Sequence, residues 1–207
     1  MPVTETGQGG ADAGAGARAT RRGRNALIVA VIAGLWLALD IATKRFFEAS
    51  GAPGEVIAGP FLGLVRFKLV HNTGMAWGMF SDSTLALGFL SLAVCAVLLI
   101  YLFVLAPRAS VGEAVGIALV FAGGLGNAID RFAQGYVVDF IDLAFMDFPV
   151  FNIADIGVTC GFVIFLAAMV WGWYRPGADD GEGDGEDADP APADAPRSDG
   201  PDGEGTR

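Results

Sequence analysis

The chain has 207 residues, of which 53% are hydrophobic and only 17% are charged. Soluble domains usually have about 25% charged residues, so this composition points away from an ordinary soluble protein. Most of the net charge of −10 comes from residues 178–207, which contain eleven acidic and two basic residues. The remainder is nearly neutral and has no basic face or stripe, which excludes a typical nucleic-acid-binding surface.

The first residues differ in composition from those that follow. Residues 1–24 are rich in small residues and then in arginine, and we expect them to form a disordered cytoplasmic N-terminus. An apolar run follows at 26–42. Arginines precede this run, as in a secretory signal, but it continues into Asp40-Ile-Ala-Thr-Lys44 without a small-residue cleavage pattern. We therefore expect an uncleaved membrane anchor.

Three further segments are apolar and long enough to cross a bilayer, which takes roughly 20 helical residues. They cover residues 84–105, 113–129 and 153–173. With the first run they predict an all-α membrane protein, whose folded domain of four transmembrane helices spans residues 25–175. Residues 176–207 are rich in Gly, Asp, Glu, Pro and Ala, so we expect a disordered acidic cytoplasmic tail.

Basic residues in the short flanking segments predict the orientation. Arginines precede the first helix, Arg108 lies between the second and third, and Arg175 follows the fourth. This pattern places both termini and the 106–112 turn in the cytoplasm. Four basic residues count against it because they fall on the outer side: Lys44, Arg45, Arg66 and Lys68. Because the three cytoplasmic segments agree with one another, we keep this orientation.

Two segments then lie on the outer side. In residues 46–83, the stretch from Leu64 to Val70 alternates apolar with basic side chains, which is typical of a strand with one polar face. This strand could lie at the lipid headgroups with Arg66 and Lys68 facing phosphates, or be a solvated edge strand, and both alternatives stay open. Residues 132–151 carry aromatic residues typical of a membrane interface: Tyr136, Phe140, Phe145, Phe148 and Phe151.

Charged residues gather at the outer ends of the predicted helices. Charges at membrane depth are costly, so those that remain usually mark a function. In the predicted topology, six of them reach one level at the outer face: Asp40, Lys44, Asp130, Arg131, Asp139 and Asp155. We expect the functional site at this level.

The third helix combines small and polar residues. Ala118, Ala122, Gly126 and Asp130 follow one another at spacings of four, so they share one helix face that another helix can approach closely. Asn127 lies within one turn of the Asp130-Arg131 pair. The pair either reacts or closes a packing seam, and we favour an orienting role.

The fourth helix begins with Phe151-Asn-Ile-Ala-Asp155. Asn is a good N-cap, and Asp155 lies in the first turn near the positive end of the helix dipole, so capping alone explains these two residues. Capping does not explain Asp139, a carboxylate between apolar neighbours that gains nothing without a partner. Asp142 and Asp147 are weaker candidates, which we expect to be solvated loop acids.

Two carboxylates in contact hold one proton between them, so Asp139 and Asp155 could activate a water and protonate a peptide carbonyl. A serine triad would need His71, the single histidine. A Ser–Lys dyad could use Lys44, but Asp40 favours its charged form, and the lysine is expected to pair with Asp40 or to extend to the headgroups. With Cys95 and Cys160 in apolar runs, the usual zinc ligands are too few.

These motifs, in chain order, resemble the lipoprotein signal peptidase family, also called signal peptidase II. The resemblance spans residues 26–174, and five blocks in the family's order carry it: Asp40-Ile-Ala-Thr-Lys44, Asn72-Thr-Gly-Met-Ala-Trp-Gly78, Gly123-Gly-Leu-Gly-Asn-Ala-Ile-Asp-Arg131, Val137-Val-Asp-Phe-Ile-Asp142 and Phe151-Asn-Ile-Ala-Asp155. Trp77 stands where the family more often has Phe.

The resemblance implies a small periplasmic β-cradle beside the four helices and an aspartic-type endopeptidase without a metal or cofactor. By the same resemblance, the catalytic pair is Asp139 and Asp155. It also implies supporting and substrate-binding roles for Asp40, Lys44, Asn72, Gly74, Asn127, Asp130, Arg131, Asn152 and Ala154.

The implied substrate is a prolipoprotein whose lipobox cysteine carries a diacylglyceryl group, cut on the amino side of that cysteine. We therefore expect a multi-pass monomer of the bacterial plasma membrane that contacts prolipoproteins and lipids but no nucleic acid. Two other functions stay open. An ion-coupled transporter usually places its acids at the membrane midplane within repeats, and a packing scaffold would use Asp–Arg pairs without catalysis.

Overall fold

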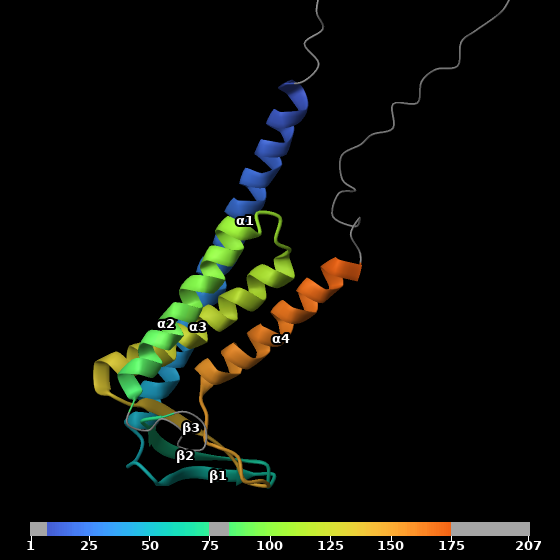
Figure 1. Ribbon diagram of the computed structural model, residues 1–207. Helices are drawn as coiled ribbons and strands as arrows, with labels where there is room; N and C mark the ends of the chain where they lie inside the picture. Colours follow the sequence, from blue (N-terminus) through green and yellow to red (C-terminus); the bar gives the residue numbers. More distant parts are fainter. Residues whose placement is uncertain (1–7, 75–82, 175–207) are drawn as a thin grey trace, which may run out of the picture. The chain divides into compact units, whose positions relative to one another are not determined.

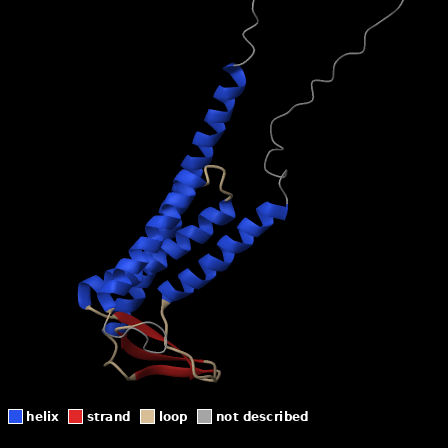
Figure 2. Cartoon of the chain, viewed as in Figure 1, coloured by secondary structure: helices blue, strands red, loops and turns tan. Residues whose placement is uncertain are grey.

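The computed structural model describes residues 8–74 and 83–174 (Figure 1). The described residues form helices and strands in the order α1, β1, β2, α2, α3, β3 and α4, which Figure 2 colours by type. Their bounds are α1 Gln8–Glu48, β1 Val56–Phe61, β2 Val65–Asn72, α2 Thr84–Ile100, α3 Val111–Gln134, β3 Val137–Leu143 and α4 Ile153–Tyr174, with a π-helical turn at Tyr101–Leu105 that extends α2.

All four helices are long and apolar enough to cross a membrane, which confirms the predicted fold class. The candidate spans are Ala19–Glu48, Thr84–Leu105, Val111–Gln134 and Ile153–Tyr174. Large apolar side chains such as Leu35, Val97 and Val163 are exposed on α1, α2 and α4, as expected for surfaces that face lipid.

The N-terminal part of the chain differs from its prediction. We expected disorder over residues 1–24, but α1 already begins at Gln8. Residues 8–24 contain five alanines, the best helix former, but also five glycines. They continue a helix whose nucleus is already formed, so their extension avoids the cost of nucleation. Residues 1–7, Trp77 and the acidic tail 176–207 lie outside the described residues.

Helix α3 is the centre of the bundle. In its apolar span 56% of the residues are buried, against 17% in α1 and in α4. The predicted small-residue face is buried at Ala118, Ala122 and Gly126. At the crossing with α4, a Cβ on Gly116 would lie 2.6 Å from the backbone nitrogen of Phe165, so only glycine allows this approach.

The sheet is antiparallel in the order β1-β2-β3. Because β2 is the central strand of the described sheet, the alternative of a solvated edge strand is excluded, and contact of Arg66 and Lys68 with lipid headgroups stays a prediction. The predicted alternation is correct: Leu69 packs in an apolar cluster with Phe47 and Phe140, while Arg66 and Lys68 line a cavity on the other face.

The sheet lies across the ends of the helices, at the C-terminal ends of α1 and α3 and the beginning of α4 (Figure 1). Phe47, in the last turn of α1, stacks on Phe140 of β3 with 4.2 Å between the ring centroids. This contact fixes β3 against the helix ends, and Asp139 precedes Phe140 in that strand. The fold therefore brings the predicted site residues to one end of the bundle.

Candidate active site

A buried lysine joins α1 to α3 at this end. The Nζ atom of Lys44 lies 2.8 Å from Asp40 Oδ2, 2.9 Å from Asp130 Oδ2 and 2.9 Å from Asn127 Oδ1. An ammonium group has three N–H donors, so these contacts use all of them. Lys44 pairs with Asp40 as one alternative predicted, and because it is buried it does not extend to the headgroups.

Asp40 continues this connection to α4. Its Oδ1 atom accepts a hydrogen bond of 2.9 Å from the backbone N–H of Ala154, one of the donors that a helix N-terminus leaves unpaired. On its other side, Asp40 lies against Gly126, where a Cβ would come within 2.5 Å of Oδ2. The small residue at 126 thus makes room for a carboxylate as well as for a helix.

Asn152 is the common partner of the two predicted catalytic carboxylates. Its side-chain nitrogen donates to Asp139 Oδ1 at 2.7 Å and to Asn127 Oδ1 at 3.1 Å. Its side-chain oxygen accepts from the backbone N–H of Asp155 at 3.0 Å, and its own backbone N–H donates to Asp155 Oδ2 at 3.1 Å. Asn152 therefore caps α4 as predicted and also holds Asp139 of β3.

Asp139 is almost fully buried, with 1% of its surface exposed. Its Oδ2 atom accepts a hydrogen bond of 2.8 Å from the side chain of Asn72. Burial, followed by the nearby charge of Asp155, raises the pKa of Asp139 to about 7. The hydrogen bonds from Asn72 and Asn152 and the charge of Lys44 lower this pKa, but burial is the largest cause. The surroundings of Asp139 therefore favour its protonated form far more than water does for an ordinary aspartate.

Asp155 is half-buried in the first turn of α4. Its Oδ1 atom accepts a hydrogen bond of 2.8 Å from the side chain of Asn127, on α3. The two carboxylates therefore share Asn152 directly, and Asn127 binds both Asp155 and Asn152.

Arg131 and Gly74 support Asn72 from the opposite side. Arg131 donates to the backbone oxygen of Gly74 at 3.2 Å and to that of Asn127 at 3.3 Å. The N–H of Gly74 in turn donates to Asn72 Oδ1 at 3.0 Å. These contacts connect Arg131 to Asp139 through Gly74 and Asn72 and also through Asn127 and Asn152. Its orienting role stays a prediction.

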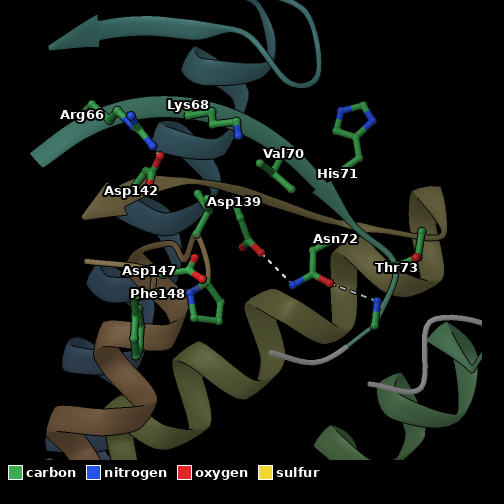
Figure 3. Close-up of a pocket in the computed structure, with 13 residues that line it drawn as sticks. Arg66, Lys68, Val70, His71, Asn72, Thr73, Asp139, Asp142, Asp147 and Phe148 are labelled. Carbon is green, nitrogen blue, oxygen red and sulfur yellow. Dashed lines mark hydrogen bonds and ion pairs between the residues drawn. The ribbon is translucent and has the colours of Figure 1, made fainter. Parts of the chain in front are cut away.

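A cavity of about 470 Å³ lies beside these residues, between β2 and the loop 147–150 (Figure 3). Asp139, Asn72 and Gly74 line one part of it, and Arg66 and Asp142 line another. Asp155 is not among the lining residues, so substrate in this cavity would meet Asp139 first. No group of three or more His, Cys, Asp or Glu residues within the described ranges is placed to hold a metal ion.

Two contacts near the site were not predicted. Asp142, which we expected to be a solvated loop acid, is a buried strand residue whose Oδ2 lies 2.6 Å from Arg66 Nε. The alternation in β2 was the signal that a basic side chain faces this cavity, but the sequence did not reveal its partner.

The indole N–H of Trp36 donates to the backbone oxygen of Ile153 at 3.1 Å and so fixes the beginning of α4. Asp147 is exposed, as expected, although it lines the cavity.

Comparisons with known proteins agree with the motifs. A family described as signal peptidase (SPase) II matches residues 32–171. The lipoprotein signal peptidase of Thermosynechococcus vestitus is 38% identical over 149 residues, which cover 70% of this chain and 90% of that protein. The lipoprotein signal peptidase of Trichormus variabilis is 41% identical over 142 residues, covering 65% and 88%.

Solved structures are also similar. One, described as a bacterial membrane enzyme, has a TM-score of 0.65 at 29% identity and covers 72% of this chain and 92% of that one. A second with the same description has a TM-score of 0.62 at 30% identity and covers 69% and 92%.

The contacts of Lys44 predict a large loss of stability on its removal. Lys44→Met would leave Asp40 and Asp130 without their cation, and breaking a buried ion pair typically costs about 3–5 kcal/mol. Thermal unfolding in detergent should therefore shift strongly downward, whereas Arg45→Met, at an exposed position next in the chain, should have little effect. Equal shifts for the two variants would show that the buried pair carries no special stability.

Proposed function

The chain belongs to the signal peptidase II family, and we propose that Asp139 and Asp155 are the carboxylates with which this aspartic-type peptidase cleaves its substrates. Family membership makes the protein a membrane enzyme that removes signal peptides from prolipoproteins. The single observation that carries the proposal is the shared partner: Asn152 hydrogen-bonds to Asp139 with its side chain and to Asp155 with its backbone N–H.

The proposed reaction begins with one proton on the pair. Asp139, whose pKa is raised to about 7, carries this proton near neutral pH. Asp155, near the positive end of the α4 dipole, is ionised and accepts a proton from the attacking water. Asp139 donates its proton to the oxygen of the scissile carbonyl, and the two carboxyl groups exchange roles when the tetrahedral intermediate breaks down. Because the carboxylates interact, they titrate as a unit.

The supporting residues hold these carboxylates in place. Each oxygen of Asp139 accepts one hydrogen bond, which leaves lone pairs free for the proton and the substrate. The fixed donors reduce the reorganisation that the reaction needs. The remaining proposed site residues act through these donors or through α4: Asp40, Lys44, Gly74, Asn127, Asp130, Arg131 and Ala154.

We propose that the substrate is cut on the amino side of a diacylglyceryl-cysteine. The position of the site at the helix ends supports this proposal, because a peptide in the cavity can reach Asp139 while its acyl chains lie against exposed apolar helix surfaces. Cleavage of a lipidated precursor and an unlipidated control at equal rates would contradict the lipid requirement. A transporter is less compatible with these observations, since its acids usually lie at the midplane.

The proposed location is the outer face of the bacterial plasma membrane, with both termini in the cytoplasm and a monomeric enzyme. The site residues lie at one end of the bundle, and arginines lie toward the other. There Arg22 donates to the backbone oxygen of Phe103 at 2.6 Å, near the turn that contains Arg108. The positive-inside rule then assigns this second end to the cytoplasm.

Replacing either proposed catalytic residue should abolish cleavage without unfolding the protein. General acid–base groups typically contribute about 10²–10⁴ in rate, so Asp139→Asn and Asp155→Asn should each lose at least about 10² in kcat on a diacylated precursor. Glu55→Gln, at an exposed outer acid off the cavity, is the matched control and should retain activity. If a correctly folded Asp139→Asn protein processes the precursor normally, Asp139 is not catalytic.

The rate should fall as the pH rises through about 7, because Asp139 then loses the proton that it donates. The hydrogen bond from Asn72 lowers the pKa of Asp139, so its removal should raise that pKa. We therefore expect the alkaline limb of the kcat profile to move to higher pH in Asn72→Ala, even if turnover is slower. A profile that stays flat or rises across the neutral range would contradict the acid role of Asp139.

A further inference from the structure

One end of the sheet is an apolar tip formed by two segments that are far apart in sequence. The turn between β1 and β2 lies beside the chain that leaves β3, and the N–H of Ala144 donates to the backbone oxygen of Leu64 at 2.8 Å. We define the apolar tip by five side chains from these segments: Phe61, Leu62, Leu64, Phe145 and Met146.

All five side chains are exposed. The exposed fraction is 95% for Leu62, 60% for Phe145 and 54% for Phe61, and Leu64 and Met146 are also about half exposed. Residues 59–64 and 143–146 contain no charged residue. Single exposed apolar residues are normal, but a contiguous group of this kind marks an interaction site.

The backbone of the turn holds Leu62 outward at a cost. Leu62 has φ of +50°, and Gly63 next to it has φ of +71°. Glycine adopts this left-handed region freely, whereas a residue with a Cβ is strained there. A leucine in this conformation, with almost no contact to the protein, indicates that its side chain binds something outside the protein.

A lipid bilayer is the partner that the structure favours. The same folded unit has helices whose exposed apolar surfaces span a membrane, and the sheet lies across the ends of those helices. In Figure 1 the turn between β1 and β2 extends sideways past the beginning of α4, at the level of the sheet below the helix ends. The lipid-facing surface of the bundle and the apolar tip are therefore on neighbouring parts of one unit.

We propose that the apolar tip inserts into the boundary between headgroups and acyl chains, in the leaflet on the sheet's side of the bilayer. Two phenylalanines and three flexible aliphatic side chains match this boundary, where aromatic and apolar residues bury next to headgroups. Arg66 follows the tip on β2 and keeps 40% of its side chain exposed even while paired with Asp142, which suits contact with lipid phosphate.

The inserted apolar tip would also fix the distance between the sheet and the lipid. Strands β2 and β3 join the apolar tip to Asn72 and Asp139, so a fixed tip limits how far these residues move from the membrane. The effect on a membrane-bound substrate rests on the proposed function, but the insertion itself does not.

Depth-dependent quenching tests the insertion without measuring cleavage. Full-length Leu62→Cys, in a Cys95→Ala Cys160→Ser background, would carry a polarity-sensitive fluorophore in phosphatidylcholine–phosphatidylglycerol vesicles. Lipids brominated near the top of the acyl chain should quench this label. Its emission should also be shifted to the blue relative to the free fluorophore in water. The control label at Ala52, an exposed residue before β1 and away from the tip, should show neither effect.

The outcomes separate lipid from other partners. Because Leu62 makes almost no contact, its labelling should leave the fold intact, and Phe145→Cys on the second segment provides an independent site. Absence of quenching at both positions overturns the proposal. Emission that shifts only as the protein density in the vesicle rises, without bromine quenching, also overturns it, since a second copy then covers the tip.

Discussion

A buried amide that must satisfy its hydrogen bonds controls the geometry of this site. Asn152 has no exposed surface, and a buried amide without partners is costly, so its donors and its acceptor all find partners on α3, β3 and α4. Two of those partners belong to Asp139 and Asp155. The Asn152 side chain holds the Asp139 carboxylate and the backbone N–H of Asp155, and the Asn152 backbone N–H holds the Asp155 carboxylate. One buried residue therefore positions two carboxylates from different elements.

The helix ends make such a polar cluster tolerable in a membrane protein. The first backbone N–H groups of α4 lack partners within the helix. Asp40 accepts a hydrogen bond from that of Ala154, and Asp155 accepts one from the backbone N–H of the capping residue Asn152. Lys44 then balances the negative charge of Asp40 and Asp130 on the side away from the cavity. The charge of Lys44 lowers the pKa of Asp139, but burial and the nearby charge of Asp155 raise it more and favour the protonated form.

Much of the fold could be predicted because its causes are local. Length and hydropathy predicted the four helices, the spacing of small residues predicted the packed face of α3, and the Asn152–Asp155 cap followed from capping chemistry. The extension of α1 to Gln8 was not predicted, because composition alone suggested disorder where an existing helix could continue.

Contacts between distant residues were harder to predict. The sequence indicated that charged groups converge at one level, but not that Lys44 bonds to Asn127 or that Arg131 reaches Gly74. Likewise, alternation predicted a strand at Leu64–Val70 but not its two neighbours, so the central position of β2 and the burial of Asp142 came only with the fold. Such pairings depend on how the elements pack, which no local pattern records.

The central claim is that Asp139 and Asp155 hold one proton between them near neutral pH. Infrared difference spectroscopy of the wild type against Asp139→Asn tests it most directly, because other protonated carboxyl groups cancel. We predict one protonated-carboxyl band at pH values below about 7, which disappears as the pH rises through the pKa of Asp139. In Asp155→Asn the band should disappear at a lower pH, because the charge that raises this pKa is gone. A spectrum without this band at slightly acidic pH, in protein that is folded and active, would contradict it.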